Sequence, residues 1–143
     1  MRYLSYRPRS ENEVRNYLRL RNYPADTVEN VLVKLRALNY LNDESFAHDW
    51  ALSRAQSHGY GPRRIEQELR AKGIDQTTTR EIVRETFAAE SEASHAKRLL
   101  TRRFKGQNLE ETKVMRRAAA FLQRRGYSSK VIFDLLRLSI DED

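Results

Sequence analysis

One helix–turn–helix pattern occurs three times in this chain, and this repetition constrains the fold more than any other feature. In each copy a leucine stands near the end of an amphipathic segment, and an asparagine or glycine follows four residues later. The leucines are Leu18, Leu69 and Leu122, and the turn residues are Asn22, Gly73 and Gly126. Because equivalent positions lie roughly 50 residues apart, the pattern predicts stacked helical modules instead of one domain closed around a pocket.

Local signals for helix ends support an all-helical fold. Ser10 and Glu13 have the spacing of a capping box. Gly61–Pro62 has the form of a helix start, since proline at the first helical position leaves no donor unsatisfied. Asp43 and Asp75 are predicted N-caps. No stretch alternates between apolar and polar residues for long enough to predict a strand.

We therefore predict an all-α protein of tandem three-helix repeats in an elongated, curved arrangement. The predicted repeats span residues 1–57, 58–106 and 107–143, and the last is the shortest. Residues 56–61 contain two of the five glycines and are the predicted hinge between the first two repeats.

Composition excludes several classes of protein. The chain of 143 residues has no cysteine, which rules out disulfides and thiolate metal sites. Its apolar stretches are only a few residues long, so we predict neither a membrane span nor a signal sequence, and we expect a cytoplasmic monomer. The 27 Lys and Arg against 20 Asp and Glu give a net charge of +7. This excess suggests a polyanion or an acidic protein as partner.

Signals for catalysis are weak. The three histidines, His48, His58 and His95, are scattered, and surface or packing roles are the base-rate expectation for each of them. The segment Gly59-Tyr60-Gly61-Pro62 lacks the lysine and the spacing of a phosphate-binding loop. We predict no cofactor, no metal and no enzymatic activity. An enzyme with a dispersed site is the remaining alternative, and it would require a pocket with strongly perturbed acidic groups.

The basic residues carry more information. On the segment after Pro62, Glu66–Arg70 and Glu68–Lys72 have the spacing of helix-surface ion pairs, so a salt-bridged exposed face and a binding face are equally plausible there. By contrast, Arg98, Arg102 and Lys105 share one helix face with no acidic residue among them. The predicted partner surface consists of Arg63, Arg64, Arg98, Arg102, Arg103, Lys105, Lys113, Arg116, Arg117, Arg124 and Arg125.

Direct binding to DNA is the alternative use of such a surface. Three-helix units with a basic last helix occur in many DNA readers, but no segment here carries the usual Arg/Asn/Gln cluster for reading bases. Contacts would therefore be to phosphates, independent of sequence and strongly sensitive to salt. The tyrosines and Trp50 recur near helix turns, where packing is a more common role than base stacking.

Four segments resemble the bacterial RecX regulatory proteins. The run from Gly59 through Gly61-Pro62-Arg63-Arg64 to Gly73-Ile74 resembles the central signature of that family. Residues 10–15 (SENEVR), 40–47 (YLNDESFA) and 122–128 (LQRRGYS) resemble its opening motif, the end of its first module and its last module. The resemblance covers nearly the whole chain.

This resemblance implies a fold and a function. It implies tandem three-helix repeats, and a protein that binds the RecA recombinase both as monomer and as filament on single-stranded DNA. It further implies that the protein lies in the groove of the filament and suppresses ATP hydrolysis, strand exchange and co-protease activity. A sequence-independent DNA-binding protein that acts without RecA remains the alternative, with weak direct DNA binding compatible with either function.

Overall fold

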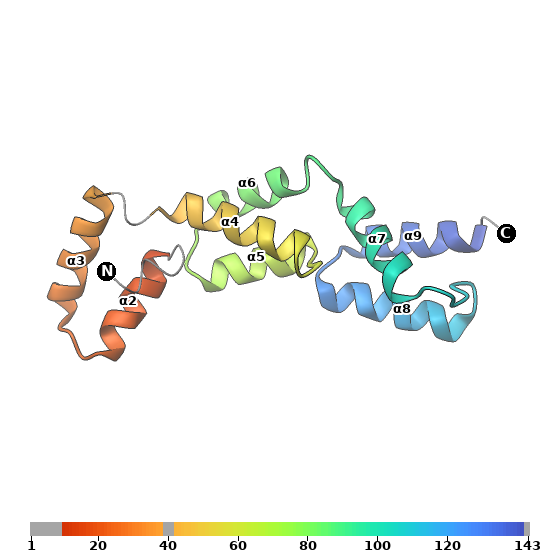
Figure 1. The fold of residues 1–143 in the computed structure, drawn as a ribbon, viewed down its shortest axis with the longest axis horizontal. Helices are drawn as coiled ribbons and strands as arrows, with labels where there is room; N and C mark the ends of the chain where they lie inside the picture. Colours follow the sequence, from red (N-terminus) through yellow and green to blue (C-terminus); the bar gives the residue numbers. More distant parts are fainter. Residues whose placement is uncertain (1–9, 39–41, 142–143) are drawn as a thin grey trace.

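The computed structural model describes residues 10–38 and 42–141, and these residues form helices joined by turns, with no strand among them (Figure 1). The helices are α2 (Glu11–Leu20), α3 (Ala25–Ala37), α4 (Asp43–Gln56), α5 (Pro62–Ala71), α6 (Gln76–Thr86), α7 (Glu92–Arg103), α8 (Thr112–Arg125) and α9 (Ser129–Asp141). Bundles of neighbouring helices follow one another along the long axis of the molecule, which confirms the predicted all-α, elongated repeat architecture.

Among the described residues, three separate apolar cores divide the helices into three groups. The first core joins α2 to α3, the second joins α4, α5 and α6, and the third joins α7, α8 and α9. The predicted repeats, 1–57, 58–106 and 107–143, were defined from the sequence pattern, and their boundaries stay a prediction. The cores group the helices differently, because α4 packs into the second core through Phe46 and Ala51 and α7 packs into the third through Ala96 and Leu100.

Most of the predicted helix ends are confirmed. The Ser10 hydroxyl accepts from the Glu13 backbone N–H while the Glu13 carboxylate accepts from the Ser10 N–H, a complete capping box. The Asp75 carboxylate caps α6 by accepting from the N–H and from the hydroxyl of Thr78. Asn22 adopts the left-handed conformation with φ 65°, which asparagine tolerates better than most residues.

The prediction for Asp43 was wrong. Asn42 caps α4 instead, and its side chain accepts from the Ser45 N–H. The Asp43 carboxylate accepts from the Glu11 N–H at the start of α2, at 2.9 Å. Burial raises the pKa of Asp43, and this backbone hydrogen bond opposes that effect. Asp43 therefore ties the second helical group to the first.

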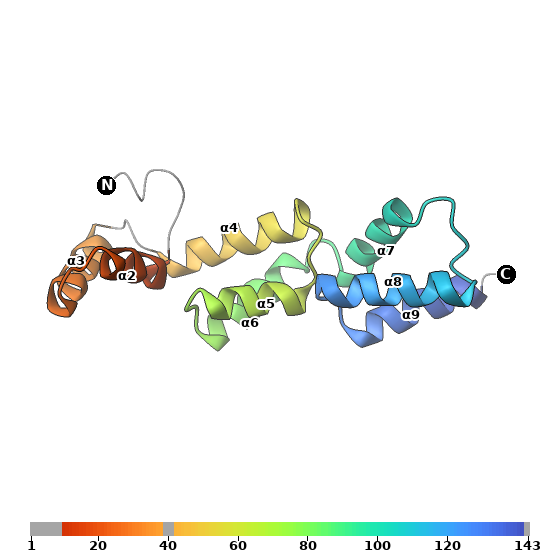
Figure 2. The same cartoon turned by 90° about the horizontal axis from the view of Figure 1, so that it is seen from below.

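The first helices of the three sequence repeats stack end to end. The C-terminus of α8 meets the N-terminus of α5 in both views of the fold (Figures 1 and 2). There the Gly61 N–H donates to the Arg125 carbonyl at 2.7 Å, and the Arg63 N–H donates to the Gly126 carbonyl at 2.9 Å. No side chain caps α5. The carbonyl groups at the end of α8 thus satisfy donors that a helix start otherwise leaves unpaired.

A second joint of the same kind links α5 to α2. The Ser10 hydroxyl donates to the Lys72 carbonyl at 3.1 Å, and the Lys72 ammonium lies 3.4 Å from the Glu13 carboxylate. A Cβ atom on Gly73 would lie 2.8 Å from the Cβ of Asn12, so only glycine fits this approach. We call the row α8–α5–α2 the helical spine. At each joint the C-terminus of one helix lies at the N-terminus of the next, so ends of opposite partial charge face each other.

Candidate functional site

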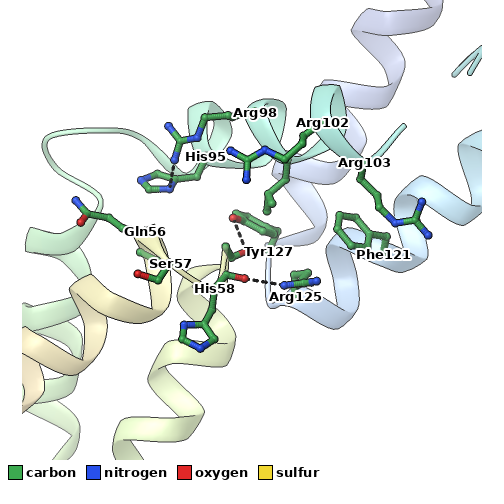
Figure 3. A pocket seen from close by; sticks show the side chains of 13 residues that line it. Gln56, Ser57, His58, His95, Arg98, Arg102, Arg103, Phe121, Arg125 and Tyr127 are labelled. Atoms are coloured by element: carbon green, nitrogen blue, oxygen red, sulfur yellow. Dashed lines mark hydrogen bonds between the residues drawn. The ribbon is translucent and has the colours of Figure 1, made fainter. Parts of the chain in front are cut away.

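A basic cleft opens at the joint between the second and third helical groups (Figure 3). Its volume is about 380 Å³. One wall is the turn between α4 and α5, and the other walls come from α7, α8 and the turn before α9. The lining residues are Ala55, Gln56, Ser57, His58, Gly59, His95, Arg98, Leu99, Arg102, Arg103, Phe121, Arg125 and Tyr127.

Four of the predicted partner-binding arginines come together in this cleft. Arg98, Arg102 and Arg103 project from α7, and Arg125 projects from the end of α8. The Arg125 guanidinium donates to the His58 carbonyl at 2.6 Å and lies 5.1 Å from the centre of the Phe121 ring. Arg103 lies 5.9 Å from the centre of the same ring. Packing on aromatic rings holds these cations in place, so the cleft is prepared for a ligand with several negative charges.

Hydrogen bonds across the joint hold the cleft in shape. The Tyr127 hydroxyl donates to the Gly59 carbonyl at 3.0 Å, and burial raises the pKa of this tyrosine. Gly59 has φ +67°, and a Cβ there would lie 2.8 Å from a methyl carbon of Leu99. The turn from α4 and the wall from α7 therefore approach each other closely because this residue is glycine. The predicted hinge at 56–61 lies at this joint, and its flexibility stays a prediction.

The prediction that Arg98 has no acidic partner was wrong. Glu90, in the turn before α7, accepts from the Arg98 guanidinium at 2.7 Å. The two residues are eight positions apart, and the turn folds Glu90 back over the first turns of α7, which helical spacing does not reveal. The hydrogen bond with Arg98 lowers the pKa of Glu90, so Glu90 stays ionised and offsets one of the four cationic charges of the cleft.

His95 completes this cluster as a buried, neutral side chain. Its Nε2 lies 2.9 Å from the Glu90 carboxylate, and its Nδ1 lies 3.2 Å from the Arg98 guanidinium. Because the guanidinium can only donate, Nδ1 must accept and Nε2 carries the proton. Burial lowers the pKa of His95 from its ordinary value of 6.5, with Glu90 opposing that shift and Arg98 adding to it. The packing role predicted for this histidine fits its edge-on contact with Phe87.

We expect His95 to make the folded protein less stable in acid. Because the pKa of His95 is lower in the folded state, the unfolded state binds a proton first as the pH falls through 6.5, and the free energy of unfolding decreases. Thermal melts at pH 7.5 and pH 5.5 should show a larger drop in Tm for the wild type than for His95→Gln, which cannot titrate. Equal drops would show that His95 does not contribute to the acid sensitivity.

The other predicted site residues lie in three places. Arg63, Arg64 and Arg124 lie at the α8–α5 joint beside the cleft, where the Arg64 guanidinium donates to the Arg124 carbonyl at 3.3 Å. Lys105 follows the end of α7. Lys113, Arg116 and Arg117 lie outside the cleft and line a separate surface hollow before and along α8. The structure thus brings together seven of the eleven predicted cations around the joint and separates four from them.

A ladder of stacked cations and aromatic rings continues from the joint along α4 and α5. The Arg64 guanidinium lies 3.8 Å from the centre of the Tyr60 ring, and Arg54 lies 4.1 Å from the centre of the Trp50 ring. Glu68 joins the ladder, since it accepts from the Trp50 indole at 3.0 Å and pairs with Arg54 and Arg64. Arg54 and Tyr60 were not among the predicted site residues, and only their proximity to Gly61–Pro62 could have indicated this role.

The predicted pair Glu68–Lys72 does not form, since Glu68 joins this ladder and Lys72 pairs with Glu13. The α5 surface therefore does form ion pairs, but most of them join α5 to residues of other helices and not to residues of α5 itself.

The chemistry of the cleft is that of electrostatic binding. Within residues 10–38 and 42–141, no group of three or more histidine or acidic side chains could hold a metal ion. None of the helices in the same part of the chain has the length and apolar character needed to cross a membrane. Guanidinium groups donate hydrogen bonds and do not accept them, so a cleft lined by arginines is suited to hold an anion.

Comparisons with known proteins agree with this architecture. Family models for the first, second and third three-helix domains of RecX match residues 1–35, 42–81 and 90–136. The regulatory protein RecX of Mycobacterium ulcerans is 34% identical over 141 residues, which cover 95% of this chain and 79% of that protein. The protein of the same name from Bacillus subtilis is 34% identical over 148 residues, and this chain spans about half of its length (54%).

Two solved structures share the fold. The crystal structure of RecX from Lactobacillus salivarius superimposes with a TM-score of 0.80 over 99% of this chain and 92% of that one, at 23% identity, and it supports the fold alone. A crystal structure of a regulatory protein RecX gives a TM-score of 0.79 at 30% identity over 94% of this chain and 67% of that one. With three domain matches in order along the sequence, and a relative at 34% identity covered over most of its length, the chain belongs to the RecX family of regulatory proteins.

Proposed function

We propose that this chain binds the RecA recombinase and its filament on single-stranded DNA, and that it inhibits ATP hydrolysis, strand exchange and co-protease activity. The observation that carries the proposal is the basic cleft at the joint of two RecX domains, where four arginines face one hollow. An elongated, basic molecule of this kind suits a long groove lined by acidic protein and by phosphates. The protein acts as a cytoplasmic monomer and as a regulator, without catalysis of its own.

The mechanism is steric and electrostatic. A ligand changes an equilibrium between two states only by the difference in its affinity for them. The chain therefore inhibits by binding one state of the filament more tightly than the others. Arg102 and Arg103 on α7 and Arg125 on α8 form contacts with the partner, and the spine spaces these contacts along the groove. Because the spine connects the helical groups, a contact made with the partner at one joint also positions the contacts made farther along the molecule.

Direct binding to DNA without the recombinase is the second candidate. The feature that favours it is the combination of exposed arginines with aromatic rings at the cleft and along the ladder, a combination that also occurs in proteins that bind single strands. In this structure, however, arginine side chains cover the rings of Tyr60 and Trp50, which leaves less of each ring for a base to stack on. Contacts would then be mainly to phosphates.

Titration of the recombinase distinguishes these functions. We expect the protein to reduce RecA ATPase activity on single-stranded DNA at concentrations well below those at which it binds the same DNA alone, both measured at physiological salt. A parallel polarisation assay with labelled DNA gives the second quantity. Binding to bare DNA at the same concentrations, with a steep dependence on salt, would favour the alternative. An unchanged ATPase rate at saturating protein would contradict the proposal.

A further inference from the structure

The third helical group carries an apolar groove on α8 and α9, separate from the basic cleft. The groove has a volume of about 620 Å³ and is lined by Met115, Arg116, Ala119, Gln123, Ser129, Ile132, Phe133, Leu136 and Arg137. Ile132 and Leu136 form its buried floor, at 9% and 5% exposure. Phe133 stands beside it with 58% of its surface exposed. An aromatic side chain exposed to this extent next to a hollow is a common sign of an interaction site.

Comparison with the other two copies shows that the fold does not require this apolar surface. Ala119 lies three positions before Leu122, the leucine of the third copy. The equivalent residues in the second and first copies are Glu66 and Arg15. Phe133 follows the same leucine by eleven positions, where the other copies have Arg80 and Glu29.

In the first copy these two positions form an ion pair, with 2.9 Å between the Arg15 Nε and the Glu29 carboxylate. The buried positions beneath remain similar, since Val28 and Leu32 are buried there as Ile132 and Leu136 are in the third copy. The same helix–turn–helix unit therefore folds with charged residues at these two positions. Only the third copy has an alanine and an exposed phenylalanine at these positions. Ala119 packs against the third core, but Phe133 does not belong to that core, so packing within the repeat does not account for the exposed phenylalanine.

The charges beside the groove identify its occupant. The charged residues among the described lining residues are Arg116 and Arg137, and the Arg137 guanidinium lies 5.6 Å from the centre of the Phe133 ring. A second copy of this chain would bring these cations against each other, and the chain as a whole carries a net charge of +7. An apolar floor with a basic rim is complementary to an amphipathic helix whose polar face is acidic.

We propose that the groove between α8 and α9 binds an acidic amphipathic helix of a partner protein, with Phe133 as the central apolar contact. The inference does not depend on the proposed function, because the groove shares no lining residue with the basic cleft. Apolar residues of the bound helix cover Phe133 and fill the space over Ala119. Carboxylates on its flanks meet Arg116 and Arg137.

The probe for this proposal is a fluorescein-labelled synthetic peptide helix with leucines on one face and glutamates on the other. Fluorescence polarisation should show saturable binding to the wild type, and a scrambled peptide of the same composition should bind about tenfold more weakly. The variants Phe133→Arg and Ala119→Glu should each weaken binding of the helical peptide about tenfold. Both introduce the residue of the second copy, so both are expected to fold, as circular dichroism would verify.

The matched control is Leu20→Arg on α2, which changes an 81% exposed apolar residue in the same way at a distant place. We expect it to bind the peptide as the wild type does. Equal affinity for both peptides, equal affinity of Phe133→Arg and the wild type, or no binding at all would each overturn the proposal. Sedimentation velocity tests the other occupant: a dimer that Phe133→Arg dissociates would assign the groove to a second copy instead.

Discussion

Replacement of Gly126 by alanine is expected to lower the free energy of unfolding by about 3 kcal/mol. The residue has φ +95°, and the left-handed conformation costs a residue with a side chain roughly 1–2 kcal/mol. A Cβ there would also lie 2.4 Å from the Cβ and 2.5 Å from the backbone nitrogen of Arg64. Because α5 cannot yield without breaking the hydrogen bonds of the joint, this clash adds an overpacking cost of roughly 1–3 kcal/mol. Urea denaturation followed by circular dichroism measures the change.

Gly106 provides the control for this substitution. It also has a positive φ, +79°, but no atom lies within 4 Å of the place where its Cβ would be. Gly106→Ala should therefore cost only the conformational part, about 1–2 kcal/mol. The difference between the two variants measures how closely α8 and α5 approach each other. If both variants lose the same free energy, the joint is looser than the structure shows.

The double charge reversal Arg102→Glu/Arg103→Glu should raise the concentration needed to inhibit the RecA ATPase by at least about tenfold. Both side chains line the cleft and are exposed, so the partner loses two attractive contacts and meets two repulsive ones. Arg98 is a weaker choice than its position in the sequence suggests, because Glu90 already offsets its charge. The inhibition curve of the variant beside that of the wild type gives the result.

An equal change of charge elsewhere tests whether position matters. Arg80 and Arg84 are exposed on α6, outside the cleft, so Arg80→Glu/Arg84→Glu alters the net charge by the same amount. This variant should inhibit within about twofold of the wild type, since only long-range attraction changes and salt screens it. If both double variants lose inhibition equally, net charge is responsible and the cleft is not the contact surface.

The sequence predicted individual helices and their ends well because those depend on neighbouring residues. The Ser10–Glu13 capping box, the proline start of α5 and the left-handed Asn22 all follow from local chemistry. The sequence did not predict which helices share a core. An amphipathic face shows that α4 is buried against something, but its period is the same whether it packs on α3 or on α5 and α6.

The sequence indicated which cations could belong to the site, but it did not predict that they converge in one cleft. Arg102 and Arg125 could be selected for their charge, yet their convergence depends on the close approach of α5 to the end of α8 at Gly61 and Gly126. Such an approach between distant segments leaves no periodic signal. The pairing of Arg98 with Glu90 was missed for a related reason. Glu90 lies in the turn before α7, and this turn brings it to Arg98 although the two residues are eight positions apart, too far for contact along one helix.

The helical spine determines which interactions break when the molecule bends. Its joints consist of hydrogen bonds from backbone and side-chain donors to carbonyl groups near helix ends, with one ion pair, while each apolar core is confined to one helical group. Bending at a joint exchanges these hydrogen bonds for bonds to water, at a net cost near 1 kcal/mol each. Each helical group can therefore stay folded while the angle between neighbouring groups changes. In this way the chain can follow the curvature of a larger assembly.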